Sequence, residues 1–499
     1  MEKQKEPHPE WATRHRTKGT ELRKINNRYY LYEYKTVYDE KKKKPRKVSG
    51  QILGSITEKN GFKPSPKRLL KENALTDTSH IQCKEYGVVK LITSKFNTYY
   101  EALKKIFGTQ ADQLIAIAYC RFVHRCPLKH IPHLLEASFL PEELGINKFN
   151  NKKASQILNN LGKDKEKMLA YMRSFVTPND HILMDFTNIF SHSRNINLAQ
   201  KGYNSSMQYD PQLNLLYIYS ANNKMPIYYR LLPGNIREVS AFKNSILEAG
   251  LHDATIVADK GFYSIKNVAM LNQANLQFIL PLRRNNRQID YTSIIQNTFT
   301  EKAVHFQHQK RIIWCEKQRI STNQYLYLFL DDELKVREQK DYLFRVQTHP
   351  EAYKLENFHK RKHSQGTLAL LSNTDQKPDH IYQTYKSRMS IEVFFDSMKN
   401  VLDIDHTYMQ NEDTLQGWMF INHLTLQWYQ HLYIELKEKN LLRKISVGDY
   451  IKFLSNIKKV KINNQWYLNE CTSSTQKFIN KVGVEIYPPK KIESKSATT

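Results

Sequence analysis

Two aspartates each stand directly after a short apolar stretch. Asp185 follows the apolar residues 182–184, and Asp259 follows the stretch 255–258. A carboxylate at the end of a buried strand loses hydration that a cation or a donor must replace. Strand ends of open α/β sheets are also where ligands bind. The pair therefore suggests a divalent metal site, although one such aspartate alone is often only a helix cap or a turn residue.

A third acidic residue belongs to a regularly spaced set. Tyr385, Arg388, Glu392 and Lys399 are offset by 0, 3, 7 and 14 residues. On one continuous α-helix this spacing places all four in a stripe about 60° wide. A carboxylate between an arginine and a lysine suits a site that holds a cation and a phosphate together. A solvated salt-bridge face would show the same spacing, and Asp396 lies on the stripe as a rival ligand to Glu392.

The elements that must position these acids alternate in type. Residues 181–284 show one strand, two hairpin-like strands and then a β-α-β unit, which predicts a mixed α/β sheet. Apolar residues such as Phe394 and Met398 lie on the other side of the expected glutamate helix. That amphipathic pattern anchors the back of the helix in a core.

The spaced set resembles a known signature. Tyr385, Arg388, Glu392 and Lys399 match, residue for residue, the Y-x2-R-x3-E-x6-K motif of a large group of bacterial insertion-sequence DDE transposases. The resemblance extends over roughly residues 180–425 and favours Glu392, rather than Asp396, as the acid.

Stretches around the aspartates are similar to the same group. Asp185, with the hydroxyl residue Thr187 two positions on, resembles the first aspartate of the group, and Asp259 resembles the second. The stretches 202–204 and 232–235 look like segments that these enzymes carry between the two aspartates. The sequence departs from the group's usual pattern at Ser205, Ser206 and Glu238.

This resemblance implies an RNase H-like catalytic core with a β-rich insertion. The long, strand-favouring stretch between Asp259 and Glu392 fits such an insertion. The resemblance also implies that Asp185, Asp259 and Glu392 are the catalytic residues and bind two Mg²⁺ or Mn²⁺ ions. Hard oxygen ligands suit these metals, and two-metal sites catalyse in-line displacement at phosphorus.

The family also implies how DNA is held. Tyr385, Arg388 and Lys399 would bind the phosphates beside the scissile bond. In some members the cut end forms a hairpin, and a base flips onto a tryptophan of the insertion. Trp314 is the candidate for that role, with a core aromatic as the alternative.

The predicted function is that of a DNA transposase that cleaves transposon ends and transfers the strands into target DNA. Two alternatives remain open from the sequence: a metal-dependent nuclease that cuts without joining, and a catalytically idle DNA-binding protein. The expected partners are double-stranded DNA, as terminal inverted repeats and as target, and a second copy of the chain in a synaptic complex.

Composition agrees with a nucleic-acid partner. The chain has 499 residues, which predicts roughly three or four folding units, and a net charge of +27. Such a charge favours a polyanion, although a solvated basic surface would also explain it. No apolar run reaches the roughly 20 residues that span a bilayer. The five scattered cysteines do not form a disulfide framework, so we expect a cytoplasmic, nucleoid-associated protein.

The sequence divides into six expected segments. They are a basic β-rich module (1–85), a helical domain (86–178), the first part of the core (179–284), the β-rich insertion (285–376), the glutamate helix (377–410), and a helical region with a basic tail (411–499).

Two features of the first 178 residues could bind DNA. In the β-rich module, strands 29–38 and 48–56 flank a lysine-rich turn at 39–47, which either contacts phosphates or is a solvated hairpin tip. In the helical domain, segments 134–139 and 152–161 around a turn at 141–145 could form a helix-turn-helix.

A cysteine and histidine cluster follows another pattern. Its members are Cys120, His124, Cys126, His130 and His133. Their spacing is not one of the usual zinc-finger spacings, so core cysteines and surface histidines are the better interpretation.

Overall fold

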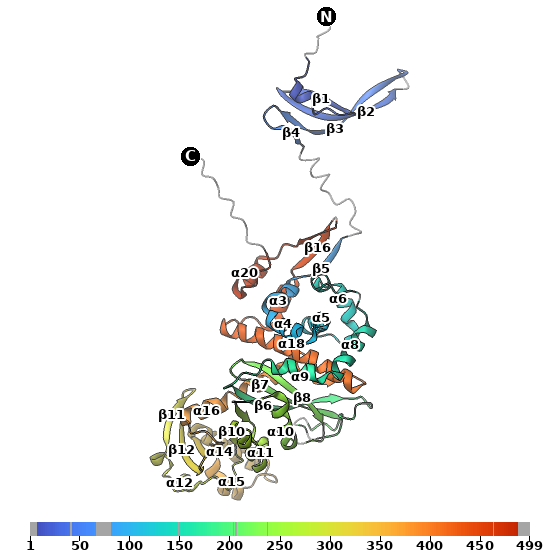
Figure 1. The fold of residues 1–499 in the computed structure, drawn as a ribbon. Coiled ribbons are helices and arrows are strands. Elements are labelled where there is room, and N and C mark those ends of the chain that lie inside the picture. Colours follow the sequence, from blue (N-terminus) through green and yellow to red (C-terminus); the bar gives the residue numbers. More distant parts are fainter. Residues whose placement is uncertain are drawn as a thin grey trace. The chain divides into compact units, whose positions relative to one another are not determined.

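The chain forms two compact units, Met1–Gln82 and Cys83–Thr499 (Figure 1). The computed structural model describes residues 7–39, 42–65, 81–147, 149–202, 204, 207–236, 238–462 and 464–487. The boundary after Gln82 lies close to the expected end of the basic module at residue 85. The five later segments expected from the sequence all lie within the second unit.

The first unit is a small antiparallel sheet. It contains α1 (Glu10–Thr13), β1 (Thr20–Ile25), β2 (Arg28–Asp39), β3 (Lys44–Thr57) and β4 (Gly61–Pro64), with the strands paired in that order. Asn26 and Asn27 both have positive φ, as a two-residue hairpin turn requires. The predicted strands are present, but most of the expected turn at 39–47 is strand, because β3 pairs with β2 from Lys44 onward.

The second unit is built on a ten-stranded mixed sheet, in agreement with the predicted α/β class. Its strand order is β11-β12-β13-β14-β10-β9-β6-β7-β8, with β15 paired to β6. The strands are β6 (His181–Ser191), β7 (Gln212–Ser220), β8 (Met225–Pro233), β9 (Thr255–Ala258), β10 (Gln277–Pro281), β11 (Val304–His308), β12 (Arg311–Ser321), β13 (Gln324–Asp331), β14 (Thr367–Ser372) and β15 (His406–Thr407). Strands β6, β9 and β10 run parallel; α10 (Glu238–Ala249) lies between β8 and β9 in the chain, and α11 (Ile265–Gln273) lies between β9 and β10.

Residues 285–376 continue this sheet. Strand β14 pairs with β13 on one side and with β10 on the other, so the strands of this segment extend the sheet that carries the aspartates. The segment also contains helices that the sequence did not predict: α12 (Thr292–Ile295), α13 (Phe299–Lys302), α14 (Asp332–Thr348), α15 (Leu355–Arg361) and the 3₁₀ helix η3 (Lys362–Ser364).

Helices from both ends of the second unit share one core. The long helix α18 (Glu412–Glu438) packs on α5 (Gln110–His124), α8 (Asn151–Lys163) and β8 (Figure 1). One cluster of buried apolar side chains runs from Tyr86 to Ile486. The expected helical domain 86–178 and helical region 411–499 therefore pack together with the sheet. The other helices of the first of these segments are α3 (Gly87–Lys95), α4 (Asn97–Phe107), η1 (Leu128–His130), α6 (Ile131–Glu136), α7 (Leu140–Leu144) and α9 (Lys165–Arg173).

The possible helix-turn-helix differs in detail from its prediction. The expected turn at 141–145 is mostly the short helix α7, which ends at Leu144 with Gly145 as its C-cap, and the expected second helix is α8. The apolar face of α8 is buried against α18, and Lys152 on its other face is exposed.

The nearby cysteines lie in the core. Cys120 and Cys126 are buried and donate to the backbone carbonyls of Ile131 and Cys120. His124 faces Glu85, with 3.4 Å between its Nε2 and a carboxylate oxygen.

A three-stranded sheet closes the second unit. Strand β5 (Gln82–Glu85) pairs with β16 (Lys458–Ile462), and β16 pairs with β17 (Gln465–Leu468). Helices α19 (Val447–Ser455) and α20 (Ser473–Val482) flank these last strands in the chain. Within the described residues, no helix has the length and apolarity needed to cross a membrane.

Candidate active site

The two aspartates lie beside each other on neighbouring parallel strands. The last residue pair between β6 and β9 is Met184 with Ala258. The next residue after Met184 is Asp185, and the next residue after Ala258 is Asp259. Neighbouring strands are about 4.8 Å apart, so the register brings the two carboxylates to one point of the sheet. Non-local pairing creates this proximity, because β7 and β8 lie between the two strands in the chain.

The expectation that Asp185 ends its strand is wrong. Strand β6 continues to Ser191, because β7 stays paired with it as far as Phe190. Strand β9, by contrast, ends at Ala258. Asp259 follows it directly and is the N-cap residue of the 3₁₀ helix η2 (Lys260–Phe262). Asp185 therefore lies at the level where the sheet loses β9 as a neighbour of β6.

The glutamate segment is not one continuous helix. It consists of α16 (Pro378–Lys386), α17 (Met389–Asp396) and a π-helical turn (Ser397–Val401), with Arg388 at the start of α17. The Ser387 hydroxyl donates to the Thr384 carbonyl (2.6 Å) at the break. The 100° wheel that predicted one stripe therefore does not apply across this segment.

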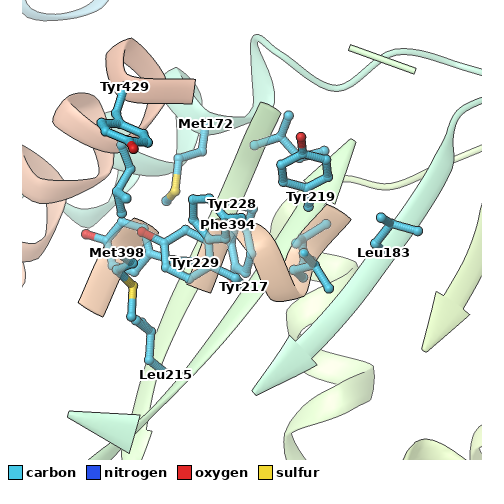
Figure 2. Close-up of a cluster of buried hydrophobic side chains, with 14 of the residues drawn as sticks. Met172, Leu183, Leu215, Tyr217, Tyr219, Tyr228, Tyr229, Phe394, Met398 and Tyr429 are labelled. Atoms are coloured by element: carbon cyan, nitrogen blue, oxygen red, sulfur yellow. The ribbon is translucent and has the colours of Figure 1, made fainter. Parts of the chain in front are cut away.

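An aromatic layer holds α17 over β6. Tyr217 pairs with Asp185 across β6 and β7, and its ring centroid lies 4.9 Å from that of Phe394 on α17. Figure 2 shows Phe394 and Met398 among Tyr217, Tyr219 and other buried side chains of the sheet. Phe394 and Met398 are almost completely buried, which confirms the predicted apolar back of the helix. The opposite side of α17 then carries Glu392.

One guanidinium joins two of the acids. Arg388 Nη1 donates to Asp185 Oδ2 at 3.1 Å, and Arg388 Nη2 donates to Glu392 Oε1 at 2.6 Å. The side chains of Arg388 and Asp185 are 18% and 20% exposed, whereas Glu392 is 52% exposed. We call the Arg388 guanidinium with its two hydrogen bonds the Arg388 fork. It is partly buried, and it holds Asp185 and Glu392 on the same side of α17.

Electrostatics place Asp259 in the same group. Burial by itself lowers the pKa of Arg388, but nearby carboxylates, Asp185 first and Asp259 second, raise it above its ordinary value. Burial raises the pKa of Tyr385, and the charges of Arg388 and Asp259 also act on that phenol. Tyr385, Arg388 and all three acids therefore share one electrostatic environment.

Lys399 contacts β6 farther along the strand than Arg388 does. Its Nζ is 3.5 Å from Asn188 Oδ1, three residues beyond Asp185. Burial lowers the pKa of Lys399, against the charge of Asp405. Asn188 was not singled out from the sequence, since an asparagine inside an apolar strand gives no specific signal.

Two other predicted residues are placed away from the fork. Asp396 is exposed and accepts a hydrogen bond from Asn400 Nδ2 (2.6 Å). Trp314 lies on β12, with its ring 5.1 Å from that of His305. Strand β12 is five strands from β6 in the sheet order, which is about 24 Å along a flat sheet. The structure therefore does not bring Trp314 to the acids.

The two stretches that resemble family segments pack against each other. A Cβ atom on Gly202 would lie 1.8 Å from the carbonyl oxygen of Gly234. Asn204 Nδ2 donates to Gln212 Oε1 (3.0 Å), and Gln212 Nε2 donates to the Gly234 carbonyl (3.3 Å). Ser205, Ser206 and the side chain of Glu238, where the sequence departs from the family pattern, lie outside the described residues.

The acids fit a divalent ion in ligand type. Carboxylate oxygens are the ligands that Mg²⁺ and Mn²⁺ prefer. Within the ranges that the structure describes, however, no three His, Cys, Asp or Glu side chains lie close enough together to hold a metal ion. Arg388 stands between Asp185 and Glu392, so joint metal binding by these acids requires that guanidinium to turn away.

Comparisons with known proteins address the family. No curated protein matches the chain. Seven chains of solved structures match it, including a piggyBac transposase in a synaptic complex with hairpin DNA. That structure is 12% identical, has a TM-score of 0.35, and the match covers 74% of this chain and 68% of that one. The family model described as Transposase DDE domain matches residues 177–428, just over half of the chain, and this region contains both aspartates and the glutamate. The chain therefore belongs to the DDE transposase family.

Proposed function

We propose that this transposase cleaves DNA at the ends of a transposable element and joins those ends to target DNA. Asp185, Asp259 and Glu392 act as its catalytic acids in an RNase H-like core. The observation that carries this proposal is the Arg388 fork, which joins Asp185 to Glu392 beside the strand register that delivers Asp259. Once Arg388 turns away, the carboxylates of Asp185 on β6, Asp259 directly after β9 and Glu392 on α17 would supply the ligands that phosphodiester chemistry with divalent ions requires.

The acids would hold two Mg²⁺ or Mn²⁺ ions. When bound, such ions lower the pKa of the attacking water or 3′-hydroxyl and stabilise the leaving 3′-oxygen. Tyr385, Arg388 and Lys399 are the groups of this chain that would hold the phosphates. Arg388 is the best placed, because a guanidinium that leaves two carboxylates can form a bidentate contact with a phosphate.

Arg388→Gln should increase the affinity for Mn²⁺ roughly tenfold in the absence of DNA. The substitution removes a positive charge that is bonded to two of the acids, and a nearby like charge opposes cation binding. Binding can be measured on the full chain from the free Mn²⁺ signal in electron paramagnetic resonance.

The matched control is Lys399→Gln, which also removes one positive charge. Lys399 contacts the Asn188 amide rather than Asp185, Asp259 or Glu392, so this variant should change Mn²⁺ affinity by less than about threefold. If Arg388→Gln instead bound Mn²⁺ more weakly, the Arg388 guanidinium would be needed to position the acids for the metal. That result would contradict the requirement that the guanidinium turn away from Asp185 and Glu392 before a metal binds.

The substrate and the assembly follow from the same proposal. We infer that the chain acts on terminal inverted repeats of an insertion sequence of the group with the Y-x2-R-x3-E-x6-K motif. The net charge of +27 supports duplex DNA as the partner and an association with the nucleoid. A second copy of the chain would bring the two ends together. A role for Trp314 in stacking a flipped base would require DNA to extend along the sheet to β12.

A strand-transfer assay tests the function. A labelled duplex that ends in the element's inverted repeat should join to a supercoiled plasmid in the presence of Mg²⁺, and Asp259→Asn should give no joined product. The inverted repeats can be identified in the DNA that flanks the gene. Cleavage without joining would make the protein a nuclease. Neither cleavage nor joining, with DNA binding intact, would make it a DNA-binding protein.

A further inference from the structure

The hairpin of β2 and β3 extends beyond the small core of the first unit. We call residues 34–39 of β2 and 44–49 of β3 the distal ribbon. Strand β1 pairs with β2 only as far as Glu33, and β4 pairs with β3 only from Gly54 onward. Within the part of the unit that the structure describes, both edges of the distal ribbon are therefore open.

None of the described residues of the first unit covers either face of the distal ribbon. All its residues on β3 are exposed, and on β2 Val37 and Tyr38 are 52% and 62% exposed. The buried core of the unit lies at the other end of the sheet, around Leu31 and Ile56. A two-stranded hairpin is marginally stable by itself in water, so the unit's own core does not explain why the strands continue this far.

Positive charge dominates this surface. The distal ribbon carries Lys35, Lys44, Arg46 and Lys47, and Asp39 is its one acidic residue. The strand register pairs Lys47 with Thr36 and Arg46 with Val37, and successive side chains alternate between faces. Both faces therefore carry cations. Among the described residues, Lys35 and Arg46 form no ion pair, so their charge is available to a partner.

These observations identify the kind of partner. We propose that the distal ribbon is an arm that binds duplex DNA by entering its major groove. The major groove admits a two-stranded β-ribbon, and cations on both faces would meet the phosphates that line its two walls. Tyr38, the most exposed aromatic side chain of the ribbon, can contact base edges or sugars. This inference goes beyond the proposed catalytic function, because all the acids of the active site lie in the other unit.

A simpler explanation for the lysines exists. Charged side chains on open strand edges prevent pairing with another chain, and this protection requires no ligand. The two explanations differ in one respect. If the lysines only protect the edges, they make no special contribution to DNA affinity. If the ribbon is a DNA-binding arm, these cations contribute more to DNA affinity than equally exposed cations elsewhere in the same unit.

The test compares two triple variants of the full chain. Lys35→Ala/Arg46→Ala/Lys47→Ala removes three charges from the distal ribbon. The control Lys18→Ala/Lys59→Ala/Lys63→Ala removes three exposed charges from the same unit, outside the ribbon. Both proteins have the same net charge. Binding to a labelled 30-bp duplex of random sequence is measured by fluorescence anisotropy over a series of salt concentrations, in EDTA so that no cleavage occurs.

The ribbon variant should bind at least about tenfold more weakly, and its slope of log affinity against log salt should be less steep by up to about 2.7, the value for three lost phosphate contacts. The control should change both quantities much less. Equal weakening of the two variants, or no weakening of either, would overturn the proposal. Equal affinity of the wild type for a duplex RNA would overturn groove entry, because the major groove of A-form RNA is too narrow.

The experiment is independent of the active site. Binding in EDTA requires neither divalent ions nor the catalytic acids, so failure of the arm and failure of the catalytic proposal give different results. Thermal unfolding of both variants should match that of the wild type, since none of the substituted side chains contributes to the buried core.

Discussion

Asp259→Asn should lower the rate of end cleavage at least about a thousandfold, an increase of about 4 kcal/mol in the activation barrier. The amide keeps the shape of the side chain but removes the negative charge that would hold a divalent ion next to Asp185. Cleavage of a labelled inverted-repeat duplex in Mg²⁺, under single-turnover conditions, measures the effect.

Asp259 is the best of the three acids for this test. Asp185 and Glu392 both pair with Arg388, so their replacement also leaves a partly buried guanidinium with one partner fewer. No side-chain ion pair of Asp259 occurs among the described residues, and its amide variant should unfold like the wild type. DNA affinity should stay the same or increase slightly, because one charge that repels phosphate is removed.

Asp396→Asn is the matched control. Asp396 is an exposed carboxylate four residues after Glu392, and it is bonded to Asn400. Its variant should cleave within about threefold of the wild-type rate, which is the scale of a surface substitution. A loss comparable to that of Asp259→Asn would mean that the helix acid is Asp396 and that the Arg388 fork marks the wrong residue.

The three acids could be named as candidates from the sequence, but the strand pairing that sets the two aspartates side by side could not be read from it. An apolar run that ends in an aspartate is a local signal, and it was present at both Asp185 and Asp259. Their proximity depends on the pairing of β6 with β9, which are separated by the hairpin of β7 and β8. No local pattern specifies that register.

In the glutamate segment the expectation of one continuous helix was wrong, yet Arg388 and Glu392 lie side by side as the spacing predicted. The predicted stripe assumed a uniform helix, whereas the chain breaks at Arg388 and ends in a π-helical turn. Arg388 nevertheless reaches both Asp185 and Glu392, since its long side chain tolerates a change in backbone direction. Lys399 lies within the π-helical turn and contacts Asn188 rather than the acids that Arg388 joins.

Two features of the fold lacked the signals on which sequence analysis depends. Helix α14 has no buried residue, so it shows no apolar period that would distinguish it from a loop. The segments 86–178 and 411–499 were both predicted to be helical, but a helical pattern does not reveal which helices pack together. In the structure, α8 and α18 cover each other although 248 residues lie between Lys163 and Glu412.

Gly162→Ala and Gly417→Ala should each destabilise the second unit by about 3 kcal/mol, the upper part of the range for overpacking. A Cβ on Gly162 would lie 1.7 Å from the Asp413 carbonyl oxygen, and one on Gly417 would lie 2.1 Å from that of Leu158. Both obstacles are backbone atoms of the facing helix, so no side chain can rotate to relieve the clash, and α8 and α18 must separate. Chemical denaturation of the full chain measures the loss.

Gly448→Ala in α19 separates this packing effect from helix propensity. A Cβ there would meet nothing closer than 3.6 Å, and alanine is the better helix former by up to about 1 kcal/mol, so this variant should be as stable as the wild type or slightly more stable. If Gly162→Ala were equally harmless, the close contact between α8 and α18 would be wrong.

The same contact between α8 and α18 also affects the active site. Gln416, next to Gly417, accepts a hydrogen bond from Tyr229 (3.3 Å), and Gln430 of α18 donates to Tyr219 (2.8 Å). Because these tyrosines belong to the buried layer under α17, a displaced α18 should also move Glu392 away from the aspartates. Gly417→Ala should therefore reduce cleavage even at temperatures where the variant remains folded.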